Sequence, residues 1–330
     1  MTRWPVAIVA LALLASCGGG QADDEQKGGA AAHKLELMLD YFPNADHAGI
    51  YAAEAGGHFR RAGVDVAIRQ PPDPAAPLKQ VAAGRVDVAI SYEPEVLRAR
   101  DQGLDVIAVG ALVQRPLTSI ISLPAAGIEG PEDLSGKRVG TSGIDYQSAY
   151  LQTILERSGR PRAREVNVGF SLTPALLTGR VDAVLGAYWN YEGTELRLQG
   201  KEPRIIRMDE VGVPTYDELV LVASVGSLRD KGPAIRSLIA ALARGTADLE
   251  RDPDAAVRGL LEANPDLDPK LQREVVKVTL PLFGAPRGKP YGYQDPAEWK
   301  AFGEWMSEQR LLEKPVGDGA FTNEYLPPAG

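Results

Sequence analysis

The sequence predicts an α/β protein with two lobes, each built around a doubly wound sheet and joined to the other by a hinge. Ten short apolar runs rich in β-branched residues alternate with longer segments of helical periodicity, which is typical of mostly parallel sheets with crossover helices. One phrase also recurs, as AGRVDVA at 83–89 and TGRVDAV at 178–184. Each copy reads as a glycine-capped helix end that runs into a strand, so the two lobes should share one plan.

The predicted strands cover residues 35–39, 64–68, 86–90, 106–109, 119–123, 138–140, 165–168, 181–185, 205–207 and 219–223. Helices are predicted between them at 75–83, 93–101, 146–158, 172–178 and 191–199. After residue 228 the strands stop, and helical periodicity continues at 234–251, 254–263, 268–279 and 295–307. This tail should pack onto the first lobe, with Trp299, Phe302 and Trp305 in the core rather than against a ligand.

The N-terminus reads as an export signal. Arg3 precedes an apolar run at 6–14, which is shorter than the roughly 20 residues that a membrane-spanning helix needs. The run ends in LASC, which resembles the bacterial lipobox, whose cysteine (here Cys17) is acylated and becomes the first mature residue. The alternative is an ordinary signal peptide with an incidental cysteine. We therefore expect a lipoprotein signal peptide at 1–16 and a flexible, glycine-rich tether at 17–33.

The net charge, the single cysteine and the absence of known catalytic motifs argue against several classes of function. Loss of residues 1–16 removes one basic residue and no acidic one, so the formal charge changes from −8 to −9, and nucleic acid is not an expected partner. Cys17 is the single cysteine, so its acylation leaves no thiol for a disulfide, a redox role or metal ligation. Neither a HExxH nor a GxSxG motif occurs in the sequence. We predict no catalysis, no metal and no cofactor.

Segments along nearly the whole predicted mature chain resemble the NMT1/THI5-like solute-binding proteins. They are LDYFPNADHAGIY (39–51), GGHFRRAGVDVAI (56–68), AAGRVDVAI (82–90), DLSGKRVG (133–140), VDAVLGAYWNYEG (181–193), PTYDELVLVAS (214–224) and TNEYL (322–326). The resemblance implies the type II periplasmic-binding-protein fold, with the ligand in a cleft between the lobes. We expect lobe I to comprise 34–115 and 219–330 and lobe II 116–218, with hinge segments near 112–118 and 211–219.

The known branches of this family imply different functions. They include binders of thiamine pyrimidine precursors, riboflavin binders, and a fungal enzyme that makes the thiamine pyrimidine from its own histidine and pyridoxal phosphate. The enzyme's cofactor lysine and donor histidine fall in a segment that aligns with 90–97, ISYEPEVL, which has neither. Its cysteine-rich iron-binding run aligns with 213–218, VPTYDE, which has no cysteine. The resemblance therefore favours a binding protein over an enzyme.

We expect a monomeric lipoprotein of an ABC importer, anchored by Cys17 at the periplasmic or extracellular face of the cell membrane, that delivers its ligand to a membrane permease. The expected ligand is a small heteroaromatic, a thiamine pyrimidine precursor of the hydroxymethylpyrimidine or formylaminopyrimidine type. Riboflavin, which would need a wider cleft, is the alternative. An anion such as an alkylsulfonate would require arginine near Gly140, and the first arginine beyond that turn is Arg157. A purely structural lipoprotein remains as another class.

Polar and aromatic side chains gather directly after the predicted strands, where ligands bind in doubly wound sheets. The first such segment carries Tyr41, Asn44 and His47, which offer a ring face together with donors and acceptors. Asn44 and His47 could instead build the turn before the next helix. Both the ligand site and the turn are therefore open interpretations of this segment.

The run YWNYE contains three aromatic residues within four positions, in a chain with only 6% aromatic residues. Tyr188 and Trp189 would stack on a ring, and Glu192 would accept from an exocyclic amine or a protonated ring nitrogen. Tyr92 and Glu93 repeat this pairing from the other lobe, so closure would place a ring between Tyr92 and Trp189. The alternatives are core packing for the aromatic residues and a helix-dipole role for Glu93.

Three more residues complete the predicted ligand site. Ser142 lies in the turn GTSG, whose backbone N–H groups could hold a ligand oxygen, although its glycines also suit a tight turn. Tyr216 and Asp217 form a further aromatic and acidic pair beside a predicted strand.

Overall fold

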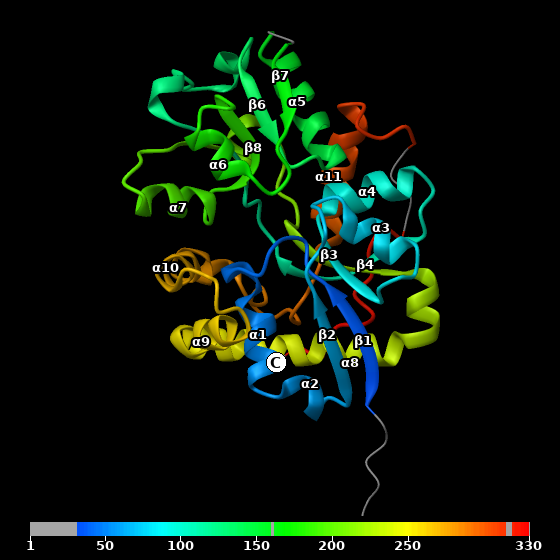
Figure 1. Ribbon diagram of the computed structural model, residues 1–330. Helices are drawn as coiled ribbons and strands as arrows, with labels where there is room; N and C mark the ends of the chain where they lie inside the picture. The colour runs from blue at the N-terminus through cyan, green and yellow to red at the C-terminus, as the bar shows by residue number, and fades with distance from the viewer. Residues whose placement is uncertain (1–31, 160–161, 315–318, 330) are drawn as a thin grey trace, which may run out of the picture. The chain divides into compact units, whose positions relative to one another are not determined.

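The computed structural model describes residues 32–159, 162–314 and 319–329 (Figure 1). The predicted signal peptide, Cys17 and nearly all of the predicted tether lie outside the described residues, so the lipid anchor stays a prediction. No helix within the described residues combines the length and apolar character that crossing a membrane requires.

The first sheet has the strand order β2-β1-β3-β10-β4. Its strands are β1 (His33–Met38), β2 (Val64–Arg69), β3 (Val88–Ser91), β4 (Val106–Val113) and β10 (Leu219–Ser224). β1 pairs in parallel with β2 and β3, whereas β10 runs antiparallel to both of its neighbours, β3 and β4. Four strands therefore share one direction, and β10 runs against them.

The second sheet repeats this topology with the order β7-β6-β8-β5-β9. Its strands are β5 (Thr118–Ser122), β6 (Arg138–Thr141), β7 (Arg164–Asn167), β8 (Ala183–Tyr188) and β9 (Arg204–Arg207). β6 pairs in parallel with β7 and β8, whereas β5 is antiparallel to β8 and β9. All ten predicted strands and the mostly parallel direction are confirmed.

The reversed strand in each sheet is the one that the chain enters from the other sheet. Thr118, the first residue of β5, pairs with Tyr188, the last residue of β8. Leu219, the first residue of β10, likewise pairs with Val113, the last residue of β4. The chain thus crosses between the sheets at the carboxyl ends of their parallel strands. A strand that starts at this edge has to run the other way.

Glu218 ties the two crossings together. Its carboxylate is fully buried and accepts hydrogen bonds from the backbone N–H groups of Leu117 (2.6 Å) and Thr118 (2.8 Å) and from the Thr118 hydroxyl (2.8 Å). The Tyr216 hydroxyl donates a further bond at 3.1 Å. Burial raises the pKa of Glu218, and these donors oppose that rise. The contact lies within both predicted hinge segments, whose boundaries stay predictions.

The repeated phrase of the sequence occupies equivalent places in the two sheets. Asp87 precedes β3, and its carboxylate accepts from the backbone N–H of Glu36 in β1 at 2.9 Å. Asp182 precedes β8, and its carboxylate accepts from the backbone N–H of Arg138 in β6 at 2.8 Å. Each aspartate therefore extends a parallel strand pair by a side-chain bond, which confirms the shared plan of the two sheets.

The five helices predicted between strands are present. They are α3 (Ala76–Ala82), α4 (Glu93–Asp101), α5 (Asp145–Arg157), α6 (Leu172–Leu177) and α7 (Glu192–Leu198). Short 3-10 helices add η1 (Ala45–His47), η2 (Pro124–Ala126), η3 (Pro131–Leu134), η4 (Met208–Val211) and η5 (Leu280–Leu282).

Two further helices lie between β1 and β2. They are α1 (Ala48–Ala55), which follows the turn at Asn44 and was expected only without bounds, and α2 (His58–Arg61), which was not predicted. The first six residues of α1 are all buried, so its sequence AGIYAAEA carries little of the apolar and polar alternation that marks a surface helix. Small residues allow this helix to pack closely. A Cβ on Gly245 of α8 (Val225–Arg251) would lie 2.3 Å from the Gly49 carbonyl oxygen of α1.

The C-terminal segment consists of α8, α9 (Pro253–Ala263), α10 (Pro269–Thr279) and α11 (Pro296–Glu308). α8 starts nine residues earlier than the predicted 234, because the chain carries Pro233 inside the helix and Ser224 caps its N-terminus. α8 packs against α1 and against strands of the first sheet. Trp299, Phe302 and Trp305 of α11 are buried in the core, as predicted.

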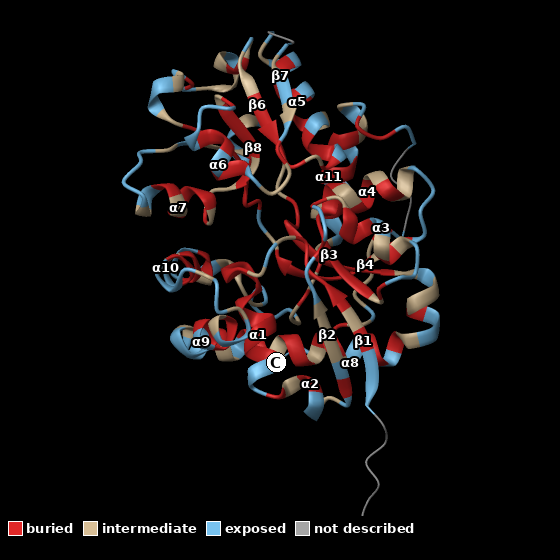
Figure 2. Ribbon diagram, in the orientation of Figure 1, coloured by how far each residue is buried: buried red, intermediate tan, exposed pale blue. Residues whose placement is uncertain are grey.

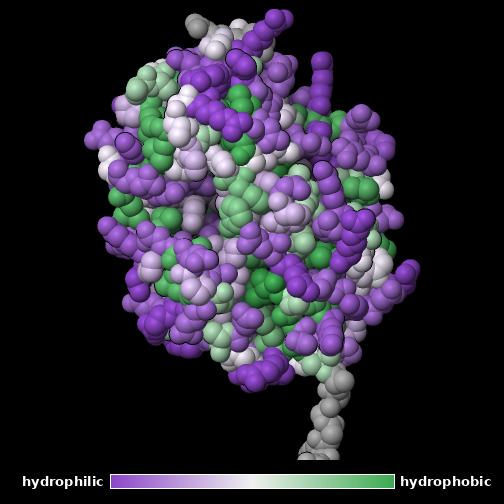
Figure 3. Space-filling model, in the orientation of Figure 1, coloured by the Kyte–Doolittle hydropathy of each residue, from purple (hydrophilic) through white to green (hydrophobic). Residues whose placement is uncertain are grey.

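Burial is concentrated in the central strands of both sheets and on the helix faces turned toward them (Figure 2). The face shown in Figure 3 is mainly polar, with apolar residues in separate patches. Large apolar side chains with at least a third of their surface exposed are spread over different elements. They are Phe42, Leu104, Leu177, Val225 and Val278.

We expect Asp87→Ala and Asp182→Ala each to lower the free energy of unfolding by about 1–2 kcal/mol, because each leaves a strand N–H without its acceptor. Urea unfolding followed by circular dichroism measures the change. Asp65→Ala on the exposed edge strand β2 is the control and should stay within about 0.5 kcal/mol of the wild type. Equal stability of all three variants would contradict the shared role of the two repeats.

Candidate ligand-binding site

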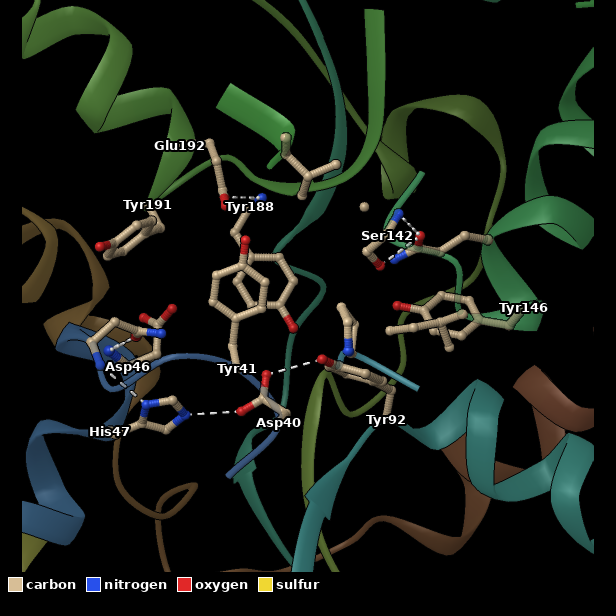
Figure 4. Close-up of a pocket in the computed structure, with 16 residues that line it drawn as sticks. Asp40, Tyr41, Asp46, His47, Tyr92, Ser142, Tyr146, Tyr188, Tyr191 and Glu192 are labelled. Atoms are coloured by element: carbon tan, nitrogen blue, oxygen red, sulfur yellow. Dashed lines mark hydrogen bonds and ion pairs between the residues drawn. The ribbon is translucent and has the colours of Figure 1, made fainter. Parts of the chain in front are cut away.

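A pocket lies where the carboxyl ends of both sheets' strands meet, which is the usual place for a ligand in doubly wound sheets. Residues that follow or end β1, β3, β6 and β8 supply most of its wall (Figure 4). The residues that line it are Asp40, Tyr41, Asn44, Asp46, His47, Pro74, Tyr92, Ser142, Ile144, Tyr146, Gln147, Leu172, Gly186, Tyr188, Tyr191 and Glu192.

Asp40 joins two other pocket residues. One carboxylate oxygen lies 2.8 Å from Nε2 of His47, and the other accepts from the Tyr92 hydroxyl at 2.9 Å (Figure 4). Nδ1 of His47 accepts from the backbone N–H of Asn44 at 3.3 Å, so Nε2 carries the proton that is donated to Asp40. Asp40 therefore orients a ring from its own loop and a ring from the loop after β3.

Asn44 builds the turn in which His47 lies. Its side-chain oxygen accepts from the backbone N–H of Asp46 at 2.8 Å, and its amide donates to the Phe42 carbonyl at 2.9 Å. With the bond to His47, these contacts form a capping box at η1. The turn interpretation of Asn44 and His47 is therefore confirmed, and both residues also line the pocket.

Asp46 is a buried acid on the pocket wall. One of its oxygens accepts from the Asn190 amide at 2.7 Å. Burial raises its pKa to about 7, with Asp40 and Glu218 also raising it and His47 and the Asn190 bond lowering it. Ionised and protonated forms of Asp46 are therefore both accessible near neutral pH.

Glu192 begins α7 and is also buried. One of its oxygens accepts from the backbone N–H of Tyr188 at 2.7 Å, which fixes the carboxyl group over the end of β8. Burial raises its pKa to about 8; backbone N–H groups lower it, and Glu195 and Asp46 raise it further. A ligand that donates to Glu192, or carries positive charge beside it, would favour the ionised form.

Five tyrosines line the pocket: Tyr41, Tyr92, Tyr146, Tyr188 and Tyr191. The rings of Tyr92 and Tyr146 are in tilted contact at 5.7 Å between centroids. Burial is the main cause that raises the pKa of each of the five phenols. The Tyr188 hydroxyl is buried and has no hydrogen-bond partner within the described part of the chain. These rings provide apolar faces with neutral hydroxyl donors.

Gly186 allows the side chain of Gln147 to reach the pocket. Gly186 has a φ of +98° at an irregular position in the pairing of β8 with β5, and a Cβ there would lie 2.3 Å from the Gln147 amide nitrogen. The Gln147 oxygen accepts from both the backbone N–H (2.8 Å) and the hydroxyl (2.9 Å) of Ser142. The backbone N–H of Ser142, which was predicted as a possible donor to a ligand oxygen, is therefore bonded to Gln147 instead.

The pocket wall is rich in carboxyl groups. Asp40, Asp46 and Glu192 are its carboxyl residues, and none of the described residues that line it is lysine or arginine. Within the described residues there is also no group of three or more His, Cys, Asp and Glu side chains arranged to hold a metal ion. Such a wall suits a neutral or cationic guest rich in hydrogen-bond donors and disfavours an anion.

Seven of the eleven predicted site residues line this pocket. They are Tyr41, Asn44, His47, Tyr92, Ser142, Tyr188 and Glu192. Their contact with a ligand stays a prediction.

Trp189 lies outside the pocket lining. Its indole N–H donates to the Pro116 carbonyl at 3.1 Å, and the guanidinium of Arg207 lies over its ring at 4.5 Å from the centroid. Because successive residues at a strand end point to opposite sides, Tyr188 faces the pocket and Trp189 faces the first chain crossing. The expected stacking of a ring between Tyr92 and Trp189 is therefore not part of this geometry.

Glu93, Tyr216 and Asp217 also lie outside the pocket lining, in the hinge region. Glu93 accepts from the backbone N–H of Asp217 at 2.7 Å, and the Asp217 carboxylate accepts from the indole N–H of Trp299 at 2.7 Å. The Tyr216 hydroxyl is used by Glu218. These groups are occupied in joining α4, the second crossing and α11, which is why they do not reach the pocket.

The pocket contains chemistry that was not predicted. Asp40, Asp46, Tyr146, Gln147 and Tyr191 line it, and all five lie in or directly beside the post-strand segments in which the other candidates were found. The position of these segments was the available signal, and it identified the segments but not every side chain that faces the pocket.

The two-sheet architecture and the pocket between strand ends define a periplasmic-binding-protein fold. The structure of the alkanesulfonate-binding protein SsuA from Xanthomonas axonopodis pv. citri, bound to MOPS, matches with a TM-score of 0.69 at 20% identity, covering 89% of this chain and 99% of that one. A Candida albicans protein described as having the generic periplasmic binding protein fold matches with a TM-score of 0.65 at 16% identity, covering 90% and 98%. Similarity at this identity establishes the fold alone.

The chain belongs to the NMT1/THI5-like family, whose model matches residues 44–256. It is 33% identical to the formylaminopyrimidine-binding protein of Halalkalibacterium halodurans over 96% of both chains. It is 36% identical to a putative thiamine biosynthesis protein of Haemophilus influenzae over 86% of this chain and 90% of the relative.

More distant relatives have other names. The riboflavin-binding protein RibY of Chloroflexus aurantiacus is 28% identical, over 89% of this chain and 86% of the relative. A 4-amino-5-hydroxymethyl-2-methylpyrimidine phosphate synthase of Legionella pneumophila is 24% identical, over 89% and 92%. The family therefore includes binding proteins and enzymes, and the relatives of higher identity named above are a binding protein and a thiamine biosynthesis protein.

The buried carboxyl groups predict a loss of stability as pH rises. Asp46 and Glu192 have folded-state pKa values of about 7 and about 8, above those of unfolded Asp and Glu. The folded state therefore binds more protons than the unfolded state between about pH 4.5 and pH 8, so their contribution is fully present below that window and is lost through it.

Glu192→Gln should remove one such group and reduce the loss of unfolding free energy between pH 5 and pH 9 by on the order of 3 kcal/mol. Urea unfolding at both pH values measures this difference. Glu202→Gln, at an exposed position after α7 and outside the pocket lining, should keep the wild-type pH profile. Parallel profiles for Glu192→Gln and wild type would show that Glu192 is not the group that titrates.

Proposed function

We propose that this protein is the solute-binding component of an ABC importer and captures a thiamine pyrimidine precursor of the hydroxymethylpyrimidine or formylaminopyrimidine type. The observation that carries this proposal is the composition of the pocket wall, with three buried carboxyl groups, five tyrosines and, among the described residues that line it, no lysine or arginine. A guest for this wall needs flat apolar faces and several N–H or O–H donors, and no negative charge.

An aminopyrimidine meets these needs. Its exocyclic amine offers two N–H donors, and its ring nitrogen supplies a third when it is protonated. Asp46 and Glu192 take up or release a proton near neutral pH, so either carboxyl can accept from the amine and from a protonated ring. The tyrosine rings would cover the faces of the heterocycle while its donors meet the acids.

The names of two relatives support the same ligand class. One is a formylaminopyrimidine-binding protein and the other a thiamine biosynthesis protein. Riboflavin, named for a more distant relative, is the alternative ligand in the same pocket. A sulfonate, as in the structural neighbour, lacks a cationic partner on this wall.

We propose that the protein is not an enzyme. The segments 90–97 and 213–218, which the resemblance aligns with the synthase's lysine and histidine and with its cysteines, contain none of these residue types. His47, the histidine of the pocket, is committed to Asp40 on one side and to the turn at Asn44 on the other. This histidine is therefore a fixed wall residue rather than a group free to react.

Export, a lipid anchor at Cys17, a monomeric state and delivery to a membrane permease complete the proposal. They rest on the apolar run before Cys17 and on the class of protein to which the fold belongs. A lipoprotein anchored beside its permease needs only a flexible connection to the membrane, as the segment 17–33 would supply.

The ligand can be identified directly. We expect the chain purified from cells and then denatured to release a pyrimidine, detected by mass spectrometry. Isothermal titration of the ligand-free chain with 4-amino-5-hydroxymethyl-2-methylpyrimidine and with riboflavin should give binding of the pyrimidine and a much weaker response to the flavin. Release of a flavin, or binding of riboflavin alone, would replace the pyrimidine proposal with the alternative.

Glu192→Gln should weaken pyrimidine binding about tenfold or more, because a charge-assisted hydrogen bond becomes a neutral one. Titration calorimetry measures this loss. Glu202→Gln, which changes the same functional group at an exposed position after α7 and away from the pocket, is the matched control and should bind like the wild type. Equal affinities in the two variants would remove Glu192 from the binding site.

A further inference from the structure

Asn190 connects three segments that are distant in the sequence. It lies in the turn between β8 and α7, belongs to the second sheet's half of the chain, and is completely buried. Its amide nitrogen donates to Asp46 in η1 at 2.7 Å and to the Thr279 hydroxyl at the end of α10 at 2.7 Å. α10 in turn packs against both η1 and α7. One amide group thus bridges elements attached to the two different sheets.

The surrounding bonds determine which way the Asn190 amide points. The Thr279 hydroxyl donates its proton to the Val275 carbonyl at 2.8 Å, so it has only lone pairs to offer Asn190. Asp46 also accepts at this point. The two hydrogens of the amide nitrogen match these two acceptors, whereas the amide oxygen is buried without a partner in the described residues.

We propose that Asn190 is a closure latch, a positioning residue that holds the two sheets' halves together over the pocket without touching the ligand itself. The proposal rests on the proposed function, because a latch is needed only where the halves separate to admit a ligand. Asn190 is absent from the pocket lining, whereas its partner Asp46 belongs to it. The latch and the pocket therefore share one carboxyl group.

Sharing Asp46 couples closure to ligand binding. A ligand that donates a hydrogen bond to Asp46 favours its ionised form, and its pKa of about 7 leaves both forms accessible for such a shift. The ionised form is the stronger acceptor for the Asn190 amide. Ligand binding should thus strengthen the latch, and by thermodynamic linkage the latch should strengthen ligand binding by the same factor.

A second contact between the same two halves differs in kind. The Tyr41 hydroxyl donates to the Phe170 carbonyl at 2.7 Å, and the Phe42 and Phe170 rings meet at 4.3 Å. Phe42 is 41% exposed, so this contact lies partly in water. Hydrogen bonds in a buried setting lose less to competition with water, which is why we assign the latch to Asn190 rather than to this contact.

The latch can be tested in the full-length chain. The chain would carry Cys17→Ser together with Asp230→Cys on exposed α8 and Glu202→Cys after α7, so that one label lies on each half. Without added ligand, Asn190→Ala should increase the mean distance between the labels, measured by resonance energy transfer. With 4-amino-5-hydroxymethyl-2-methylpyrimidine as the probe, the same variant should dissociate roughly five- to twentyfold faster, with an association rate within about threefold of the wild type.

Two further variants separate a latch from a merely structural residue. Thr279→Val removes one acceptor at nearly constant volume and should change label distance and dissociation in the same direction, so it carries the test if Asn190→Ala does not fold. Asn264→Ala removes a similar amide bond, to Leu260 at the end of α9, and should leave both readouts at wild-type values.

Unchanged label distances and dissociation rates in both Asn190→Ala and Thr279→Val would overturn the latch. If the wild type does not bind the probe, the hydroxymethylpyrimidine is excluded as the ligand. The label distances without ligand still decide whether Asn190 holds the halves together.

Discussion

The carboxylate of Glu218 sets the relation between the two sheets. It is fully buried at the place where the chain passes from one sheet to the other, and its acceptors are filled by donors from both crossings. A buried carboxylate is costly unless every lone pair has a donor, so small departures from this arrangement are unfavourable. The crossings are thereby held side by side. The strand ends that surround the pocket depend on that connection, because both β5 and β10 start beside it.

The carboxyl groups of the pocket, like Glu218, accept hydrogen bonds from neighbouring donors. Asp40 is held by an imidazole and a phenol, Asp46 by an amide, and Glu192 by a backbone N–H. These donors fill some of the acceptor positions of three acids and leave others to face the pocket. A ligand with N–H groups would fill the remaining acceptor positions, whereas an anionic ligand would add negative charge to the pocket. On the proposed function, selectivity would follow from this unfilled hydrogen-bonding capacity.

Strand positions could be predicted because buried strands of β-branched residues stand out against helices of mixed composition. The segments that line the pocket followed from the strands, since the chain must leave each strand at the same edge. Individual side chains were harder to predict. Tyr188 and Trp189 are neighbours of similar chemistry, yet only Tyr188 faces the pocket, because the direction at the end of β8 depends on an irregular pairing at Gly186.

Acidic residues near helix ends were also ambiguous in the sequence. Asp46 lies in the first turn of a short helix, where an acid is common for reasons unrelated to ligands. Only its burial and its bond to Asn190, 144 residues further along the chain, distinguish it from an ordinary first-turn acid. The extent of helix α1 was not predicted, for a related reason. It is buried nearly all round by contacts with α8 and α9, so its sequence lacks the polar face by which helices are recognised.

Two sheets of equal topology build a pocket whose two sides differ. The equivalent aspartates Asp87 and Asp182 support the same strand pairs in both halves, so the scaffold repeats. The loops at the strand ends do not repeat. The first half contributes a carboxylate bonded to histidine and tyrosine, and the second contributes an amide, tyrosines and Glu192. In the proposed closure, the two equivalent sheets would move as units about the crossings, and the unlike loops would make the closed state specific for an unsymmetrical ligand. Because the proposed latch at Asn190 depends on the ionisation of Asp46, it would couple closure to the hydrogen-bonding groups of the ligand.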